Sequence, residues 1–358
     1  MKTIFTILMS LLISVVIAQD KVFVHKATTG NSTGNVTTLD HPDLNGNPNA
    51  NIIISHNLNS EGVQYNNKIT GTWYDGSNWT VFNEDLSSII EGSSYNIYIP
   101  QGGKLITEEA DGSSYTLELN DPAINGNPNA IIVYANYWNP NQVYNNHNYG
   151  FWYSDSSQRW NIYNEETTTE IPANATFSLL IDEGTGNADA FSHITTAGNT
   201  TANYTILDHP SLNGKPEAYP VISHNWGTAS DSWSNILDKT IGVWYNGNNW
   251  TIYTEDTSTM PEDIKFNIYV ASEPLSINDQ TIANITTYPN PTRDQVTFTS
   301  KSAITSVSIY NLLGQKVKEF VGNKTTNLTI NISELAAGNY IAKVQAGKAV
   351  QSVKLIKL

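Results

Sequence analysis

Apolar residues in most of this 358-residue chain occur in short runs, several of which alternate with polar residues. Runs such as NIIISH (51–56), IIVYAN (131–136) and KFNIYVA (265–271) are rich in Val, Ile, Tyr and Phe, and clusters of Gly, Asn, Pro and Asp separate them. No window keeps a helical apolar period. The pattern therefore predicts an all-β fold of short antiparallel strands. Asp75-Gly76 and Asn246-Gly247 predict hairpin turns, because these turns need positive φ.

Two sequence blocks occur three times along the chain. The first block reads LDHPDLNGNPNA (39–50), LNDPAINGNPNA (119–130) and LDHPSLNGKPEA (207–218). The second reads GTWYDGSNWTVFNED (71–85), GFWYSDSSQRWNIYNEE (150–166) and GVWYNGNNWTIYTED (242–256). Repetition at this spacing predicts three homologous modules, at residues 21–100, 101–182 and 183–272. We expect each to be a small antiparallel β-sandwich or barrel, with the Leu-Asn-Gly block as a fixed corner of the fold.

The first 18 residues have the pattern of a secretory signal peptide. Lys2 gives a positive start, residues 4–18 are almost entirely apolar, and Val16 and Ala18 occupy the positions for cleavage before Gln19. The apolar stretch is shorter than the ~20 residues of a membrane-spanning helix. We therefore expect an exported chain without a transmembrane segment after cleavage.

Residues 285–358 form a different module, after an expected protease-sensitive linker at 273–284. Alternating runs separated by Asn-Pro, Leu-Gly and Ala-Gly turns predict a further, immunoglobulin-like β-sandwich. Three motifs occur in order: Tyr288-Pro289-Asn290-Pro291, Leu313-Gly314-Gln315 and Ala337-Gly338-Asn339-Tyr340. This stretch resembles the C-terminal sorting domain of the type IX secretion system of Bacteroidetes. The resemblance implies export, passage across the outer membrane by the type IX machinery, and removal of the tail by its sorting protease. It places the protein outside the cell or on the outer cell surface.

Charge and composition exclude several classes of function. The chain has a net charge of −15, so nucleic acid is not an expected partner. Residues 19–284 carry eight basic and thirty acidic residues, a net charge of −22, and residues 285–358 carry +6. No cysteine is present, so there is no disulfide, no cysteine-ligated metal and no thiol nucleophile. Nucleophile-elbow, phosphate-loop and His-Glu-x-x-His motifs are also missing, and we predict that the protein is not an enzyme.

Histidine and carboxylate patterns offer two alternatives that involve chemistry. His25, His41 and His56 recur as His193, His209 and His224, and the middle repeat has only His147, at a different place. Three imidazoles can hold a metal if the fold gathers them, but we favour structural roles. Paired carboxylates recur as Glu84-Asp85, Glu165-Glu166 and Glu255-Asp256. A glycosidase needs two facing carboxyl groups, and adjacent strand residues point to opposite faces, so we interpret these pairs as solvated strand ends.

Calcium is a further cofactor that the sequence raises, and we do not expect it. An Asx-rich loop could be built from Asp40, Asp43, Asn45, Asn47 and Asn49. Calcium prefers several carboxylates, and the two later copies have Ala123 and Ser211 in place of Asp43. We therefore predict no cofactor.

Aromatic residues give the candidate binding site. The tryptophans that recur in every copy are expected in the core, because large rings dominate burial. These are Trp73 with Trp79, Trp152 with Trp160, and Trp244 with Trp250. Trp138, Trp226 and Trp233 lie instead in the segments that differ between copies, where an exposed ring can stack on a sugar.

The predicted function is a secreted or surface-displayed binding or adhesion protein, whose repeats bind a glycan or another surface ligand. The alternatives are an exported glycan-acting hydrolase and a structural spacer of the cell surface or matrix. The repeats resemble an uncharacterised repeat domain of secreted bacterial proteins, through their Asn-Pro-Asn-Ala and Gly-Val-Trp-Tyr blocks. That resemblance implies no activity.

Overall fold

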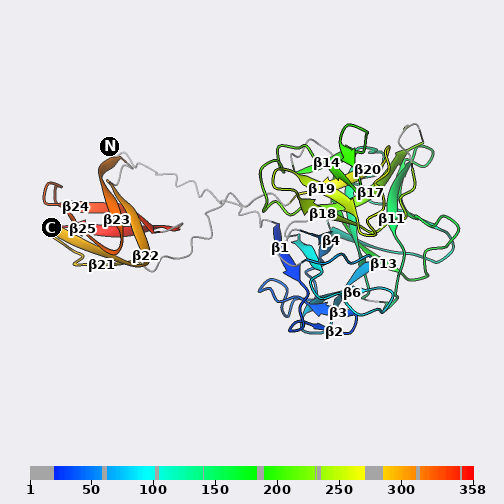
Figure 1. Ribbon diagram of the computed structural model, residues 1–358, viewed down its shortest axis with the longest axis horizontal. Coiled ribbons are helices and arrows are strands. Elements are labelled where there is room, and N and C mark those ends of the chain that lie inside the picture. Colours follow the sequence, from blue (N-terminus) through cyan, green and yellow to red (C-terminus); the bar gives the residue numbers. More distant parts are fainter. Residues whose placement is uncertain are drawn as a thin grey trace, which may run out of the picture. The chain divides into compact units, whose positions relative to one another are not determined.

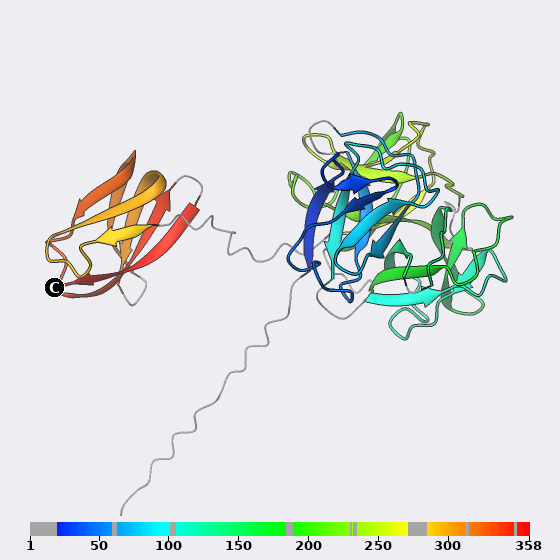
Figure 2. The same ribbon diagram turned by 90° about the horizontal axis from the view of Figure 1, so that it is seen from below.

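The computed structural model describes residues 20–58, 63–100, 105–139, 141–183, 189–229, 231, 235–270, 285–311, 315–346 and 349–358. These residues form β-strands joined by turns, as the sequence pattern predicts (Figures 1 and 2). None of them belongs to a helix long and apolar enough to cross a membrane. The chain divides into two compact units, Met1–Glu273 and Pro274–Leu358. The predicted signal peptide (1–18) and the predicted linker (273–284) lie outside the described residues.

The first unit contains the three repeats. The first repeat contributes β1 (Lys21–Lys26), β2 (Ser32–Thr33), β3 (Val36–Thr38), β4 (Ile53–Asn57), β5 (Thr70–Tyr74), β6 (Trp79–Asn83) and β7 (Ser94–Ile99). The second contributes β8 (Leu105–Glu109), β9 (Thr116–Glu118), β10 (Ile131–Tyr137), β11 (Tyr149–Ser154), β12 (Arg159–Asn164) and β13 (Thr176–Asp182). The third contributes β14 (Ala190–Ile194), β15 (Thr200–Thr201), β16 (Tyr204–Ile206), β17 (Val221–Thr228), β18 (Ile241–Tyr245), β19 (Trp250–Thr254) and β20 (Lys265–Tyr269).

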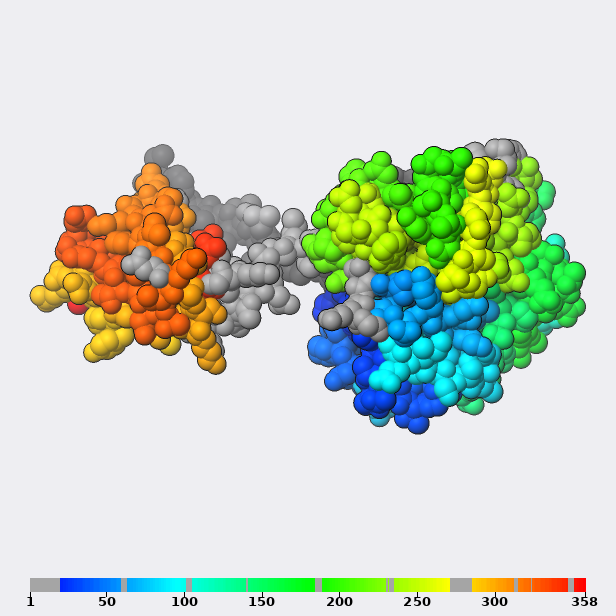
Figure 3. Space-filling model, in the orientation of Figure 1, coloured from blue at the N-terminus to red at the C-terminus, as the bar shows by residue number. Residues whose placement is uncertain are grey.

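Each sheet of this unit takes strands from two repeats. The sheet orders are β1-β7-β4-β18-β19-β16-β15, β2-β3-β6-β5-β10-β13-β8 and β14-β20-β17-β11-β12-β9. The repeats meet at parallel pairs, β4 with β18, β5 with β10, and β11 with β17, whereas pairs within a repeat are antiparallel. Each repeat therefore pairs with both others, and the three close into a ring. Figure 3 shows the yellow surface of the third repeat lying against the blue and cyan surface of the first.

The Leu-Asn-Gly block is held by the hairpin that follows it. Trp79, Trp160 and Trp250 are fully buried, as predicted for recurring tryptophans. Their indole N–H groups donate to the backbone oxygens of Asn47, Asn127 and Lys215, each at 2.8 Å. The glycine of the block has φ near +70° in each copy, a conformation that favours glycine. The predicted fixed corner is thus a turn in which one backbone carbonyl accepts a hydrogen bond from a buried tryptophan.

The predicted hairpins are confirmed in the first and third repeats. β5 pairs with β6 around Asp75-Gly76, and β18 pairs with β19 around Asn246-Gly247. Gly76 and Gly247 have φ of 101° and 98°. These hairpins place Trp73 and Trp244 on strands that reach the junctions between repeats.

The second unit consists of β21 (Thr286–Tyr288), β22 (Gln295–Tyr310), β23 (Lys316–Asn331), β24 (Gly338–Ala346) and β25 (Ala349–Lys357). The register between the long strands β22 and β23 shifts between Thr299 and Ile304. Irregularities of this kind bend the strands in which they occur. The sheet encloses its own core, which includes Phe298, Val307 and Val344. This arrangement fits the β-sandwich that the sequence predicts.

Candidate functional site

The first carboxylate of each recurring pair is buried where two repeats meet. Glu84, Glu165 and Glu255 are 3%, 3% and 4% exposed. The interpretation of these residues as solvated strand ends is therefore wrong. Each carboxylate accepts a backbone N–H from the next repeat around the ring. The donors are Asn145 to Glu84 at 2.8 Å, Leu237 to Glu165 at 2.9 Å, and Asn66 to Glu255 at 2.9 Å. The three glutamates therefore link neighbouring repeats by hydrogen bonds at equivalent positions of the ring.

Histidine and tyrosine complete two of these junctions. His224 Nδ1 contacts the carboxylate of Glu165, and His56 Nδ1 lies 2.9 Å from Oε1 of Glu255. The hydroxyl groups of Tyr163 and Tyr253 donate to the same carboxylates, at 3.0 Å and 2.7 Å. Several donors at a buried carboxylate offset the cost of removing it from water.

The junction between the first and second repeats lacks both partners. Asn136 occupies the position of the histidine, and Phe82 occupies that of the tyrosine. Burial raises the pKa of Glu84 to about 7, although the bonds from Asn145 and Asn136 lower it. Glu84 therefore ionises near neutral pH, and this junction has no histidine to balance its charge.

A glycine at each junction leaves room for the buried carboxylate or for the aromatic ring beside it. Gly71, Gly150 and Gly242 lie opposite Asn136, His224 and His56 in the parallel pairs. A Cβ on Gly150 would lie 2.6 Å from both Glu165 Oε1 and the Tyr163 hydroxyl. The recurring glycine of the Gly-x-Trp-Tyr block is thus required by the junction.

Gly150→Ala is expected to lower the free energy of unfolding of the repeats by about 1–3 kcal/mol, because it overpacks a closed junction. Urea unfolding followed by tryptophan fluorescence measures this directly, since all nine tryptophans lie in the repeats. Gly30→Ala is the control, because its Cβ would approach only Thr28 Oγ1, at 3.7 Å. Equal stability of the two variants would contradict the account of this glycine.

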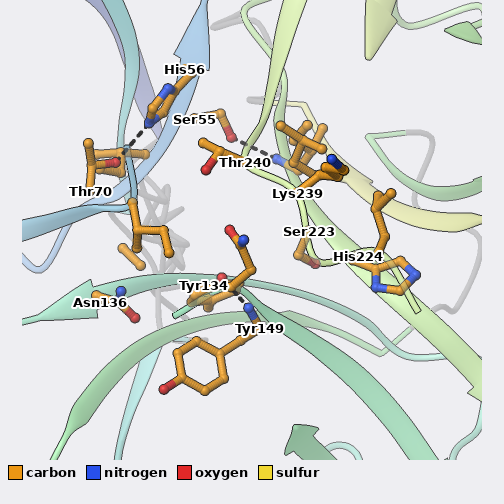
Figure 4. A pocket seen from close by; sticks show the side chains of 17 residues that line it. Ser55, His56, Thr70, Tyr134, Asn136, Tyr149, Ser223, His224, Lys239 and Thr240 are labelled. Atoms are coloured by element: carbon orange, nitrogen blue, oxygen red, sulfur yellow. Dashed lines mark hydrogen bonds between the residues drawn. The ribbon is translucent and has the colours of Figure 1, made fainter. Parts of the chain in front are cut away.

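A small pocket of mixed polar and apolar lining lies where the three repeats meet (Figure 4). Its volume is about 80 Å³, which suits a few water molecules rather than a sugar ring. His56 Nε2 lies 2.9 Å from Thr70 Oγ1. Ile241 takes the place of Thr70 in the third repeat, and His224 Nε2 has no partner among the described residues. We interpret this pocket as part of the junction rather than as a ligand site.

An open, apolar cleft of about 280 Å³ lies between the second and third repeats. It is lined by Tyr115, Thr116, Trp152, Tyr163, Thr167, Trp226, Ala229 and Ile236. Trp152 and Trp226 meet edge to face, with ring centroids 6.4 Å apart. Tyr115 and Ile236 are 43% and 45% exposed, which is unusual for large apolar side chains in a hollow. We call this the second junction cleft.

A related cleft of about 130 Å³ lies between the first and second repeats. It is lined by Asn35, Val36, Trp73, Phe82, Trp138 and Tyr144. Trp73 and Trp138 meet edge to face at 5.4 Å, and Tyr144 is 44% exposed. Alignment of the repeats places these six residues at the same positions as Tyr115, Thr116, Trp152, Tyr163, Trp226 and Ile236. We call this the first junction cleft.

The candidate tryptophans thus fall at two junctions. Trp138 follows β10 directly and Trp226 lies on β17, and both are half-buried cleft residues. Trp233 lies outside the described residues. Trp73, Trp152 and Trp244 were expected in the core, but all three are half-buried. Trp73 and Trp152 line the clefts. Their recurrence in every copy reflects a junction position, which the sequence of one repeat cannot reveal.

The recurring histidines have separate partners. His25 and His193 contact the hydroxyls of Thr37 and Thr205, and burial lowers the pKa of both to about 4. His41 and His209 stack on phenylalanine rings, Phe23 and Phe191. His147, in the middle repeat, lies 3.8 Å from Glu166. Within the described ranges, no group of three His, Cys, Asp or Glu is placed to hold a metal ion.

The Asx-rich turn is occupied by its own hydrogen bonds. Asn45 Nδ2 donates to Asp40 Oδ1 at 2.7 Å, and Lys21 Nζ lies 2.7 Å from Asp43 Oδ2. Asn47 Oδ1 accepts the backbone N–H of Asn49. One side-chain oxygen of each of Asp40, Asp43 and Asn47 thus has a protein donor.

In the tail, Asn290 of the sorting motif forms hydrogen bonds with the backbone of β25. Asn290 Nδ2 donates to the Lys354 carbonyl at 2.7 Å, and its Oδ1 accepts the Ile356 N–H at 2.9 Å. Pro289 and Pro291 flank it, Tyr288 is 81% exposed, and Gly338 begins β24. Gly314 lies outside the described residues.

Comparisons with known proteins place most of the chain in two families. Residues 286–358 match the family described as Secretion system C-terminal sorting domain. The protein is therefore one that carries a type IX sorting tail, exported to the cell surface or the extracellular space and engaged by that secretion system. The chain belongs to the family described as Domain of unknown function (DUF7452), which matches residues 5–99, 103–165 and 150–270.

Two individual proteins share similarity with the chain. An ulvan lyase of Nonlabens ulvanivorans is 30% identical over 149 residues, which is 41% of this chain and 26% of that protein. The chain thus spans about a quarter of this curated relative. A solved structure, the BSP domain of a biofilm-associated protein, covers 86% of this chain and 56% of its own, with 10% identity and a TM-score of 0.16. A score this low carries no argument.

Proposed function

We propose that this exported protein binds a glycan at its junction clefts and does so without catalysis. The observation that carries the proposal is the second junction cleft, where Trp152 and Trp226 form apolar walls that are open to solvent. Flat aromatic rings pack well against the C–H faces of sugar rings, and most ligand sites are concave with apolar walls.

Hydrogen bonding also favours a hydroxyl-rich ligand. The indole N–H groups of Trp138 and Trp152 are buried and find no acceptor among the described residues. A buried donor without an acceptor is costly, so a ligand oxygen that reaches either group would relieve that cost. A purely apolar ligand offers no such gain.

A glycan array probed with the full chain tests the proposal. We expect specific binding that falls at least about tenfold in Trp226→Ala and Tyr115→Ala, a loss of about 1.4 kcal/mol. Tyr115 is partly exposed, so its truncation leaves the core intact. Ile90→Ala, at an exposed residue that does not line either cleft, is the control. A blank array, or binding that survives both cleft variants, would refute the proposal and favour a protein ligand or a spacer role.

A glycan-acting enzyme is the second candidate, and the similarity to an ulvan lyase favours it. Incubation of the full chain with ulvan, followed by measurement of the polymer's size, tests it. Shortening of the polymer by the pure protein would support an enzyme, and an unchanged size would leave the binding proposal.

A further inference from the structure

The third junction departs from the other two at two positions. Leu58 takes the place of Trp138, and its N–H donates to the Val243 carbonyl at 2.9 Å, as that of Trp138 donates to Thr72 at 3.0 Å. Tyr204 takes the place of Val36 and Thr116, which line the open clefts. Its ring packs edge to face on Trp244, with centroids 5.7 Å apart. This junction therefore lacks one aromatic wall and has a tyrosine against the other.

The charge of the repeats narrows the ligand class. Among the residues that the structure describes, no charged side chain lines either junction cleft. Residues 19–284 carry a net charge of −22. The negative charge of the repeats would repel an anionic polymer, and no cationic side chain lining a cleft would offset that repulsion. An uncharged sugar chain experiences no such electrostatic repulsion.

We propose that the repeats contain two matched subsites for an uncharged sugar polymer, one in each junction cleft, and that the third junction is closed. The inference rests on the proposed function and adds the ligand's charge class and the number of sites. The larger second cleft is the tighter subsite, because it presents more apolar wall. Two subsites on one ring bind a repeating polymer more tightly than either alone, through effective concentration.

Titration calorimetry of the full chain with cellohexaose and with mannohexaose tests the inference. We expect two oligosaccharides bound per chain in the wild type for at least one of these sugars. The number falls to one in Trp138→Ala, and to one weaker site in Trp226→Ala. Ile90→Ala keeps both sites. One site in the wild type, or a stoichiometry that Trp138→Ala leaves unchanged, would overturn the paired subsites.

A charged oligosaccharide tests the ligand class. Hexagalacturonate is expected to bind at least about tenfold more weakly than the better neutral hexamer at low salt. Equal or tighter binding of the uronate would overturn the inference that the ligand is uncharged.

The closed junction can be opened by design. Leu58→Trp with Tyr204→Thr recreates the second junction cleft between the third and first repeats, so a folded double variant is expected to bind three hexamers. Two sites in a variant with native circular dichroism would contradict the role given to Leu58 and Tyr204. If the double variant does not fold, the single variants at Trp138 and Trp226 still decide the inference.

The two proposals fail in different ways. If neither neutral hexamer binds but the array finds another glycan whose binding is lost in Trp226→Ala, this inference fails and the proposed function stands. If the array is blank and neither hexamer binds, both fail.

Discussion

Glu165→Ala is expected to lower the free energy of unfolding of the repeats by about 3–5 kcal/mol, because it leaves a buried histidine unpaired. His224 loses its carboxylate, and the Leu237 N–H and the Tyr163 hydroxyl lose their acceptor. For a unit of this size the melting temperature should fall by roughly 6–20 °C. Thermal unfolding followed by tryptophan fluorescence measures the shift.

The neighbouring residue provides a matched control for this variant. Glu166 has a side chain that is 55% exposed, so Glu166→Ala is expected to change stability by less than about 0.5 kcal/mol. If Glu165→Ala and Glu166→Ala melt together, the buried carboxylate does not hold the ring closed.

Glu84→Gln is expected to remove a pH-dependent loss of stability between about pH 5 and pH 8. Burial raises the folded pKa of Glu84 from 4.5 to about 7, so across that window the folded state holds a proton that the unfolded state has lost. The free energy of unfolding therefore falls by about 3 kcal/mol as pH rises through this window. Above the window Glu84 is ionised in both states, and its titration changes the stability no further. Glutamine remains neutral and keeps an oxygen to accept the Asn145 N–H.

The measurement is urea unfolding of the wild type and Glu84→Gln at several pH values. The variant should gain stability relative to the wild type as pH rises from 5 to 8. Glu91→Gln, at an exposed glutamate, is the control and should show no such trend. A stability difference between Glu84→Gln and the wild type that does not vary with pH would count against a raised pKa.

Local patterns made much of the fold predictable. The alternation of apolar residues gave the strands, and the Asp75-Gly76 and Asn246-Gly247 pairs gave two hairpins with positive φ. The buried Trp79, Trp160 and Trp250 were also expected. These features depend on residues close together in one repeat, so their physics is visible in a single copy.

The junctions were not predictable, because they depend on residues in different repeats. Glu84 and Asn145 are 61 residues apart, and Glu255 and Asn66 are 189 apart. Nothing near Glu165 in the sequence distinguishes a buried carboxylate from a solvated strand end. Parallel pairing of β4 with β18 joins the first repeat to the third, and no local turn specifies it. The clefts follow from these pairings, so only Trp138 and Trp226 were anticipated, from their place in variable segments.

Amide hydrogen exchange of Asn66, Asn145 and Leu237 tests most directly whether the three repeats close into one ring. These N–H groups lie outside the strands, and each donates to a glutamate of another repeat. A closed ring predicts that all three exchange only on global unfolding, as slowly as amides of the core strands. Exchange as fast as that of Gly76, in an exposed turn, would show that the repeats are not joined in this way, and the clefts between them would lose their basis.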